Sequence, residues 1–306
     1  MTKQKIIIDC DPGHDDAFAL LLSVYDPSLD LIGVSTCAGN QTIEKTSLNA
    51  SNLLNYFNRG DIKVAKGESN PLVRPILTCP EIHGESGLDG FTFPKYDIVY
   101  NKLKGYESII KNVKENIDIV VVATGPLTNV AKAIKEDPSI LPSIKEIVIM
   151  GGSTKEGNIT KEAEFNILVD PEAADIVFKC GRPIRMLGLN VTRQILVTPD
   201  VVKNAGKINT RGSELFVKLM EVFNRNQKEF FGLDSAPLHD PATLVALINK
   251  DAFVFEDMNV TIDTSFTELA GKTICSKSRP YNAKVATKVD VNKYWEVLFE
   301  NLRRCV

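Results

Sequence analysis

The sequence has few of the features that mark secreted or membrane-spanning proteins. Its six cysteines are scattered and include no C-x-x-C pair, a spacing typical of reduced thiols rather than of a disulfide framework or a zinc site. The first hydrophobic run, residues 6–8, ends at Asp9 and is too short for a signal peptide. The longest later run, near residues 119–123, is too short to cross a bilayer. These absences predict a cytoplasmic protein that contacts no membrane.

The chain also lacks an excess of positive charge. It has 36 Lys and Arg against 39 Asp and Glu, so its formal net charge is -3. Such a balance does not produce the broad positive field that a nucleic-acid-binding protein needs, and we expect no nucleic-acid partner. A small polar substrate, or a metal ion held by a local group of carboxylates, is compatible with this composition.

The 306 residues, 43% of them hydrophobic, instead show short β-branched runs that alternate with helical stretches. Strands are predicted at residues 5–9, 31–36, 117–123, 147–150 and 184–189, helices at residues 16–25, 41–57, 127–135, 170–181, 213–230 and 240–248, and two or three further strands between residues 255 and 290 before a helix at 293–303. This alternation predicts an α/β fold with a mostly parallel, doubly wound (Rossmann-like) sheet and helices on both faces. With no linker or repeat in sight, residues 1–306 are expected to form a single domain, with Trp295 packing the last helix against the sheet.

Four carboxylates lie close together in D-C-D-P-G-H-D-D, residues 9–16, directly after the first predicted strand. Pro12 and Gly13 tighten the turn, so these carboxylates repel one another unless a positive group lies among them. Clustered carboxylate oxygens are the ligands that Ca²⁺ and Mg²⁺ prefer. The two acids at residues 15 and 16 could instead favour the positive end of the next helix, but that leaves the other two without a role. The motif therefore favours a metal site at the carboxyl end of a strand, where ligands of such sheets bind.

The motif resembles the opening of the inosine-uridine preferring nucleoside hydrolase family, and further segments resemble that family in the same order. They are AGN at residues 38–40, IHGESGLDG at 82–90, ATGPLTN at 123–129, MGG at 150–152, GNITKEAEFNILVDPEAA at 157–174 and HDPA at 239–242. The likeness extends from residue 6 to about residue 246. It implies a Ca²⁺-dependent enzyme that splits a ribonucleoside into ribose and free base, and that assembles as a homo-oligomer, a tetramer or a dimer.

The resemblance also implies roles for individual residues. The Ca²⁺ ligands would be Asp11, Asp16, the main-chain carbonyl of Thr124 and Asp240, with Asp11 also the general base for a calcium-bound water. The ribose hydroxyls would be held by Asp15, Asn40, Asn158, Glu164 and Asn166. The side of the leaving base would be lined by His83, Gln227 and His239.

These residue types suit the reaction. Cleavage of a glycosidic bond builds positive charge on the sugar ring, and an acid-rich pocket stabilises that charge. Ca²⁺ acidifies a bound water less than Zn²⁺ does, so a carboxylate such as Asp11 has to take the proton. Direct attack by water predicts inversion at C1′. His239 is expected to be catalytic, since histidine has the ordinary pKa best suited to proton donation near neutral pH.

Some of the same residues have a structural alternative. Asp240 precedes Pro241 and could merely cap a helix, and Thr124 could have ordinary strand-end geometry. His83 is expected on a mobile loop that could close the site. Phe165 is counted among the substrate-binding residues, although aromatic side chains such as those at 165, 223, 230 and 231 belong to a core more often than to a pocket.

Base preference and reaction class each leave alternatives. His14, Gln227 and His83 resemble the pyrimidine-preferring members of the family, which favours uridine and cytidine over inosine, but some of those members have a tyrosine where this chain has Phe230-Phe231. A haloacid-dehalogenase-like phosphohydrolase also places D-x-D after its first strand. A non-catalytic nucleoside-binding protein could keep the fold without turnover. Hydrolysis of a phosphate ester, or tight nucleoside binding without hydrolysis, would favour these two alternatives respectively.

Overall fold

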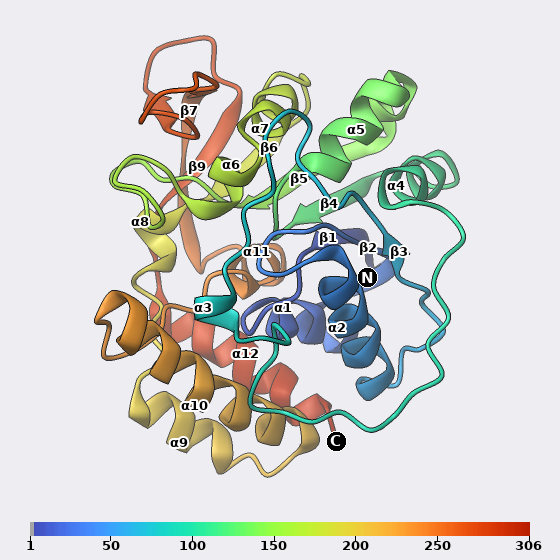
Figure 1. Ribbon diagram of the computed structural model, residues 1–306, viewed down its shortest axis with the longest axis vertical. Coiled ribbons are helices and arrows are strands. Elements are labelled where there is room, and N and C mark those ends of the chain that lie inside the picture. Colours follow the sequence, from blue (N-terminus) through green and yellow to red (C-terminus); the bar gives the residue numbers. More distant parts are fainter. Residues whose placement is uncertain (1–2) are drawn as a thin grey trace.

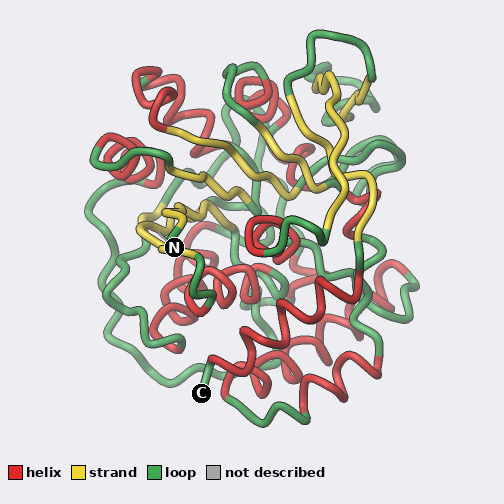
Figure 2. The backbone as a smooth tube through the Cα atoms, turned by 180° about the vertical axis from the view of Figure 1, so that it is seen from behind, coloured by secondary structure: helices red, strands yellow, loops and turns green. Residues whose placement is uncertain are grey.

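Nine strands form one sheet in the computed structural model, which describes residues 3–306 (Figures 1 and 2). The strands are β1 (Gln4–Cys10), β2 (Leu29–Thr36), β3 (Ala65–Lys66), β4 (Ile119–Ala123), β5 (Ile144–Met150), β6 (Ile184–Leu187), β7 (Phe253–Ile262), β8 (Thr273–Ser276) and β9 (Ala283–Val289). They lie in the order β3-β2-β1-β4-β5-β6-β9-β7-β8. Pairing is parallel from β3 through β9, and β7 runs antiparallel to both β9 and β8. The predicted mostly parallel α/β sheet is confirmed.

Helices cover both faces of the sheet, as expected. They are α1 (Asp16–Tyr25), α2 (Ile43–Tyr56), α3 (Pro80–His83), α4 (Gly105–Lys114), α5 (Thr128–Glu136), the 3-10 helix Pro138–Ser143, α6 (Phe165–Val169), α7 (Pro171–Phe178), α8 (Leu189–Thr192), α9 (Pro199–Gly206), α10 (Arg211–Phe231), α11 (Pro241–Ile248) and α12 (Val291–Arg304). Figure 1 shows α9, α10 and α12 stacked on one side of the molecule and α4 and α5 on the other.

The central strands contribute side chains to a hydrophobic core on each face of the sheet, because successive side chains of a strand point to opposite faces. Ile6 and Ile8 of β1 belong to the hydrophobic core shared with α1, α2, α10, α11 and α12. Ile7, between them, belongs to the core shared with α4, α5 and α7. All five residues of β4 are fully buried, which explains why its sequence, IVVVA, has no polar residue.

The strand register brings the candidate residues to one edge of the sheet. Cys10 at the end of β1 pairs with Thr36 of β2, and Asp9 pairs with Ala123 at the end of β4. Ala123 in turn pairs with Ile149 of β5. The segments that follow these strands therefore begin side by side, at the carboxyl edge where ligands of parallel sheets bind.

The structure adds elements that the sequence did not predict. The elements β3, α3, α4, α6, α8 and α9 fall in segments for which no helix or strand was expected. Trp295 packs edge-on against Phe216 of α10 and belongs to the hydrophobic core that includes Ile6 and Ile8 of the sheet. None of the helices described for residues 3–306 combines the length and hydrophobicity needed to cross a bilayer.

Candidate active site

A pocket opens at the carboxyl edge of β1, β4 and β5 and holds about 550 Å³ of empty space, its open mouth included. Its lining consists of Asp15, Asn40, Cys79, Ile82, His83, Thr124, Met150, Asn158, Ile159, Glu164, Phe165, Asn166, Phe223, Gln227, Phe231, His239 and Asp240. Every predicted site residue is in this lining except Asp11 and Asp16, which are fully buried beneath it. The structure thus brings together residues from positions 11 to 240 of the chain.

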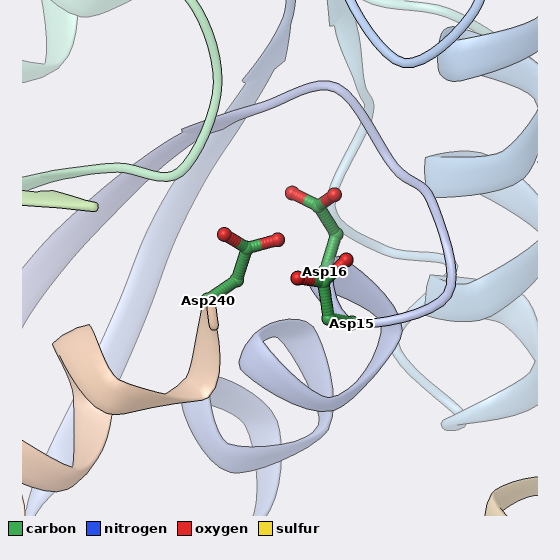
Figure 3. Close-up of side chains that lie close together, drawn as sticks. All are labelled: Asp15, Asp16 and Asp240. Carbon is green, nitrogen blue, oxygen red and sulfur yellow. The ribbon is translucent and has the colours of Figure 1, made fainter. Parts of the chain in front are cut away.

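Three carboxylates gather at the floor of the pocket (Figure 3). One oxygen each of Asp15, Asp16 and Asp240 lies within 4.8 Å of the others. Figure 3 shows the Asp240 side chain, at the start of α11, facing the two acids at the start of α1. Within residues 3–306, none of the three forms an ion pair with a lysine or arginine. The group has the all-oxygen character that a hard divalent cation prefers.

Asp11 lies outside that group of three, and one of its carboxylate oxygens lacks a hydrogen-bond partner in residues 3–306. Its Oδ2 accepts the main-chain N–H of Asn40 at 2.7 Å, whereas its Oδ1 is buried and has no hydrogen-bond partner in residues 3–306. A buried carboxylate oxygen without a partner costs free energy, so its presence points to an absent positive or donor group. Asn40 also bonds Asp16, with its Nδ2 3.1 Å from Oδ2, and so holds the two acids in one arrangement.

The electrostatics of the floor are unfavourable without a cation. Burial, followed by the charge of Asp16, raises the pKa of Asp11 well above its ordinary range. Burial and Asp16 likewise raise the pKa of Asp15 to about 7, and burial together with Asp15 and Asp16 raises the pKa of Asp240 well above normal. Four carboxylates in this volume cannot all be ionised near pH 7 unless a positive charge joins them. The residues therefore fit a divalent cation such as Ca²⁺ or Mg²⁺.

Asp9, the first acid of the motif, lies below this cluster and outside the pocket lining. It is 1% exposed, and its Oδ1 accepts the Ser35 hydroxyl at 2.5 Å and the Asn129 amide at 2.8 Å. A haloacid-dehalogenase-like mechanism would need this aspartate as a nucleophile in contact with substrate. These bonds to β2 and α5 give Asp9 a structural role, which does not support that alternative.

Thr124 follows β4 directly and takes part in the cluster through two groups. Its hydroxyl donates to Oδ1 of Asp16 at 2.7 Å, and its carbonyl accepts Nδ2 of Asn166 at 2.8 Å. The carbonyl has a second lone pair, which leaves it able to bind a cation.

The structure contradicts the alternative that the Asp240 side chain caps a helix. Asp240 occupies the N-cap position of α11, but its side chain accepts no capping hydrogen bond. Asp170, which also precedes a proline, caps α7 by accepting the N–H of Ala173. Two aspartates with the same sequence signature thus have different surroundings.

We expect this difference to appear when each aspartate is replaced by alanine. Asp170→Ala should lower the free energy of unfolding by about 1–3 kcal/mol, because it removes a cap and leaves the Thr128 hydroxyl and the Leu72 N–H without their acceptor. Asp240→Ala should cost little stability in chelator, since it relieves repulsion, yet abolish nucleoside hydrolysis. Urea unfolding with excess chelator, and base release at saturating Ca²⁺, measure the two effects. A large stability loss in Asp240→Ala alone would restore the capping interpretation.

The wall on the predicted sugar side consists of amides and one acid. Both oxygens of Glu164 accept main-chain N–H groups, Oε1 from Asn166 and Oε2 from Gly152 and Ile167, so this acid caps α6 as well as lining the pocket. Burial raises the pKa of Glu164 to about 7. Asn158 accepts the Phe165 N–H with its Oδ1, at 2.9 Å. These contacts leave the Nδ2 of Asn158 and the Oδ1 of Asn166 as a donor and an acceptor for a sugar.

The rest of the lining includes two histidines and several aromatic rings. His239 donates or accepts at Nδ1 with the Thr192 hydroxyl, 2.7 Å away, which leaves Nε2 for the pocket. Burial, then the charge of Arg193, lowers the pKa of His239 to about 3. The expectation of a histidine that titrates near neutral pH is therefore wrong for His239, because the side chain is removed from water. It is a neutral imidazole at physiological pH.

The structure also places His83 and the phenylalanines that the sequence singled out. His83 ends the one-turn helix α3 and is buried, with 6% of its surface exposed, so it belongs to a structured part of the wall. Phe165 lines the pocket, as do Phe223 and Phe231 of α10, whereas Phe230 is 48% exposed and lies outside the lining.

Several lining residues were not predicted from the sequence. Cys79, Ile82, Met150 and Ile159 have apolar side chains with no motif of their own. Ile82 and Met150 begin the segments IHGESGLDG and MGG, so their neighbours in the motif were the available signal. No comparable signal marks Thr192, which is brought to His239 by the turn between β6 and α8.

The comparisons with known proteins agree with this geometry. The sequence profile described as inosine-uridine preferring nucleoside hydrolase matches residues 6–296. The pyrimidine-specific ribonucleoside hydrolase RihB of Shigella flexneri serotype 5b (strain 8401) is 38% identical over 308 residues, covering 99% of this chain and 98% of that protein. Among solved structures, the plant nucleoside hydrolase PpNRh1 matches with a TM-score of 0.91 at 32% identity, covering 98% of this chain and 99% of that one. The purine-preferring ribonucleoside hydrolase from Gardnerella vaginalis matches with a TM-score of 0.90 at 30% identity and the same coverage.

Proposed function

This chain belongs to the inosine-uridine preferring nucleoside hydrolase family, and we propose that it hydrolyses the N-glycosidic bond of uridine and cytidine, and less readily of inosine, in a Ca²⁺-dependent reaction. Membership makes it a nucleoside hydrolase, which is a glycosidase acting on a small-molecule nucleoside. The observation that carries the finer proposal is the floor of the pocket, where buried carboxylates gather close to the amides of Asn158 and Asn166.

The cation would be held by Asp11, Asp16, Asp240 and the main-chain carbonyl of Thr124. The unpartnered Oδ1 of Asp11 and the mutual approach of Asp16 and Asp240 support this set. Asp15 belongs to the same group of oxygens and also lines the pocket, and we assign it to the ribose, as the family resemblance implies. When bound, Ca²⁺ would offset the repulsion among the acids and orient a water molecule toward the sugar.

Asp11 is the proposed general base. Its Oδ1 is free of protein partners and could face the cation, while Oδ2, which accepts the Asn40 N–H, has a second lone pair for the proton of the attacking water. As the water oxygen bonds to C1′ and gives up that proton, the C1′–N bond breaks and the base departs with its electron pair, which yields ribose with inverted configuration.

The proposed sugar contacts come from both sides of the floor. Asp15, Asn40, Asn158, Glu164 and Asn166 would hold the ribose hydroxyls. Their negative and dipolar groups would stabilise the positive charge that develops on the ring as the glycosidic bond breaks. The base would then lie against Phe165 and the wall that carries His83, Gln227 and His239.

The preference for pyrimidines rests on similarity and on the wall of the pocket. RihB, at 38% identity, is named pyrimidine-specific, whereas the purine-preferring enzyme from Gardnerella vaginalis shares 30%. Phe231 brings a ring without a hydroxyl to the base side, so hydrogen bonding to the base is left to histidine and glutamine.

Release of free base and ribose from uridine, cytidine and inosine, with and without chelator, tests the proposal. We expect hydrolysis that chelator abolishes and Ca²⁺ restores, with kcat/KM for uridine at least about tenfold above that for inosine, a difference of roughly 1.4 kcal/mol. Equal or greater activity toward inosine would reject the pyrimidine preference. Nucleoside binding without base release at saturating Ca²⁺ would reject catalysis.

We also propose that residues 1–306 form one nucleoside hydrolase domain that works in the cytoplasm as a homo-tetramer or dimer; residues 1 and 2 lie outside the described structure. Exposed apolar side chains support an assembly surface, among them Phe266 at 77% and Val73 at 61%. Multi-angle light scattering of the purified protein would distinguish tetramer, dimer and monomer.

A further inference from the structure

The turn at Gly13 and His14 packs directly against the imidazole ring of His83. The main-chain N–H of His14 lies 3.2 Å from Nδ1 of His83. A Cβ added to Gly13 would come within 2.4 Å of Nδ1 and 2.7 Å of Cε1 of the same ring. Gly13 is not among the glycines with positive φ, so glycine is needed here for space rather than for its backbone freedom.

The side chain of His14 fixes the segment that carries His83. Its Nε2 lies 2.8 Å from the carbonyl oxygen of Asp89, which can only accept, so Nε2 of His14 carries a proton. The carboxylate of Asp89 accepts the N–H groups of Glu85 and Ser86, at 3.1 Å each, and thereby closes the turn directly after α3. The ring of His14 also lies nearly parallel to Phe223, with centroids 5.2 Å apart.

These contacts determine which nitrogen of His83 carries the proton. A main-chain amide can only donate, so Nδ1 of His83 accepts from the His14 N–H and holds a lone pair there. Nδ1 of His14 lies 3.4 Å from the same nitrogen, but in the neutral ring it holds a lone pair and donates no proton, so the shorter main-chain contact sets the tautomer of His83. The proton of the neutral His83 ring is then on Nε2, which has no hydrogen-bond partner in residues 3–306, and His83 lines the pocket.

We propose that Gly13 and His14 are positioning residues that hold His83 as its Nε2–H tautomer, so that it donates a hydrogen bond to the departing pyrimidine. The inference rests on the proposed function, in which His83 lies on the base side. A pyrimidine that leaves through N1 gains negative charge on its carbonyl oxygens, and a fixed neutral donor stabilises that charge without a proton transfer.

The tautomer can be measured without any activity. Histidine appears only three times in the chain, so ¹⁵N-histidine labelling gives three ring systems, and His14→Gln and His239→Gln identify two of them. We expect His83 to show an unprotonated Nδ1 and a protonated Nε2 at pH 7 in the Ca²⁺-loaded protein. The opposite tautomer, or a doubly protonated ring, would overturn the proposal even if the enzyme hydrolyses uridine as expected.

Activity separates positioning from general support of the fold. His14→Gln keeps an amide donor near the place of Nε2 and should retain most uridine hydrolysis, whereas His14→Phe keeps the stacked ring but loses the bond to Asp89. We expect His14→Phe to lower kcat for uridine by roughly 10- to 100-fold, a typical loss when a residue that orients a functional side chain is removed. Its loss on p-nitrophenyl riboside, whose leaving group needs no hydrogen-bond donor, should be at least about tenfold smaller.

Two further variants address His83 itself. Glutamine places an amide nitrogen near the position of Nε2, and asparagine near that of Nδ1, so His83→Gln should retain more uridine hydrolysis than His83→Asn. Equal losses in the two variants, or equal losses on both substrates in His14→Phe, would overturn the positioning role. Failure of the unmodified enzyme to release any base would instead count against the proposed function and leave the tautomer measurement standing.

Discussion

Replacement of Asp11 by asparagine is expected to abolish nucleoside hydrolysis while leaving the metal-free protein at least as stable as the unmodified chain. The variant removes the proposed base and one proposed cation ligand together, so kcat should fall by at least about 10³-fold. The hydrogen bond from the Asn40 N–H can persist, because the asparagine Oδ1 accepts as a carboxylate oxygen does. The repulsion with Asp16, which raises the pKa of Asp11, disappears.

A second buried aspartate serves as the matched control for Asp11. Asp26 is 5% exposed and accepts hydrogen bonds from the Ser28 N–H and hydroxyl and from Asn301, outside the pocket lining. Asp26→Asn should lose stability but keep kcat, the reverse of Asp11→Asn. Steady-state uridine hydrolysis and urea unfolding in chelator give both numbers for each variant. More than a few per cent residual turnover in Asp11→Asn at saturating Ca²⁺ would remove Asp11 from the role of base.

The parts of the fold that the sequence could predict are those whose burial is set locally. β4 is buried on both faces, and such a strand shows itself as an unbroken run of Val and Ile. Helix α4 was missed because it begins at Gly105 and buries only a narrow stripe that includes Ile109 and Val113. β3 has two residues, and its pairing with β2 depends on contacts far away in the sequence.

In the candidate site, the sequence could predict which residues meet but not their protonation states. The register of parallel strands places the segments after β1, β4 and β5 together, which is why motif residues dispersed from Asp11 to Asp240 meet in one pocket. Their protonation could not be predicted, because it depends on desolvation by the whole fold. His239 is neutral for this reason, despite an ordinary histidine pKa near neutrality. Asp170 and Asp240 likewise share the Asp-Pro signature, and only their tertiary surroundings make one a cap and leave the other free.

Addition of Ca²⁺ is expected to raise the melting temperature, and to raise it more at pH 8 than at pH 5. The pH dependence follows from the acids whose pKa is raised in the folded protein, to about 7 for Asp15 and Glu164 and to about 6 for Asp9. Between pH 4 and pH 7 the unfolded chain has released these protons while the metal-free folded protein retains them. The folded state thus binds more protons, and the stability of the metal-free protein falls as the pH rises through this range.

Burial also raises the pKa values of Asp11, Asp16 and Asp240, so a cation held by these three acids competes with protons for them and offsets the loss. At a Ca²⁺ concentration 100 times the dissociation constant, binding adds about 2.7 kcal/mol, which corresponds to a rise in melting temperature of roughly 4 °C at pH 8. At pH 5 the same concentration should give less than half that rise. Differential scanning fluorimetry with Ca²⁺, Mg²⁺ or chelator at both pH values provides the measurement.

Two variants decide whether the effect comes from the proposed ligands. Asp240→Ala should lose most of the Ca²⁺-dependent rise at pH 8, whereas Asp170→Ala, which removes a true helix cap, should start from a lower melting temperature but keep the rise. A rise of equal size at pH 5 and pH 8 would mean that the cation does not compete with protons, and hence does not bind these carboxylates. A rise that Mg²⁺ reproduces in full, with hydrolysis restored, would keep the site and replace Ca²⁺ by the smaller ion as its occupant.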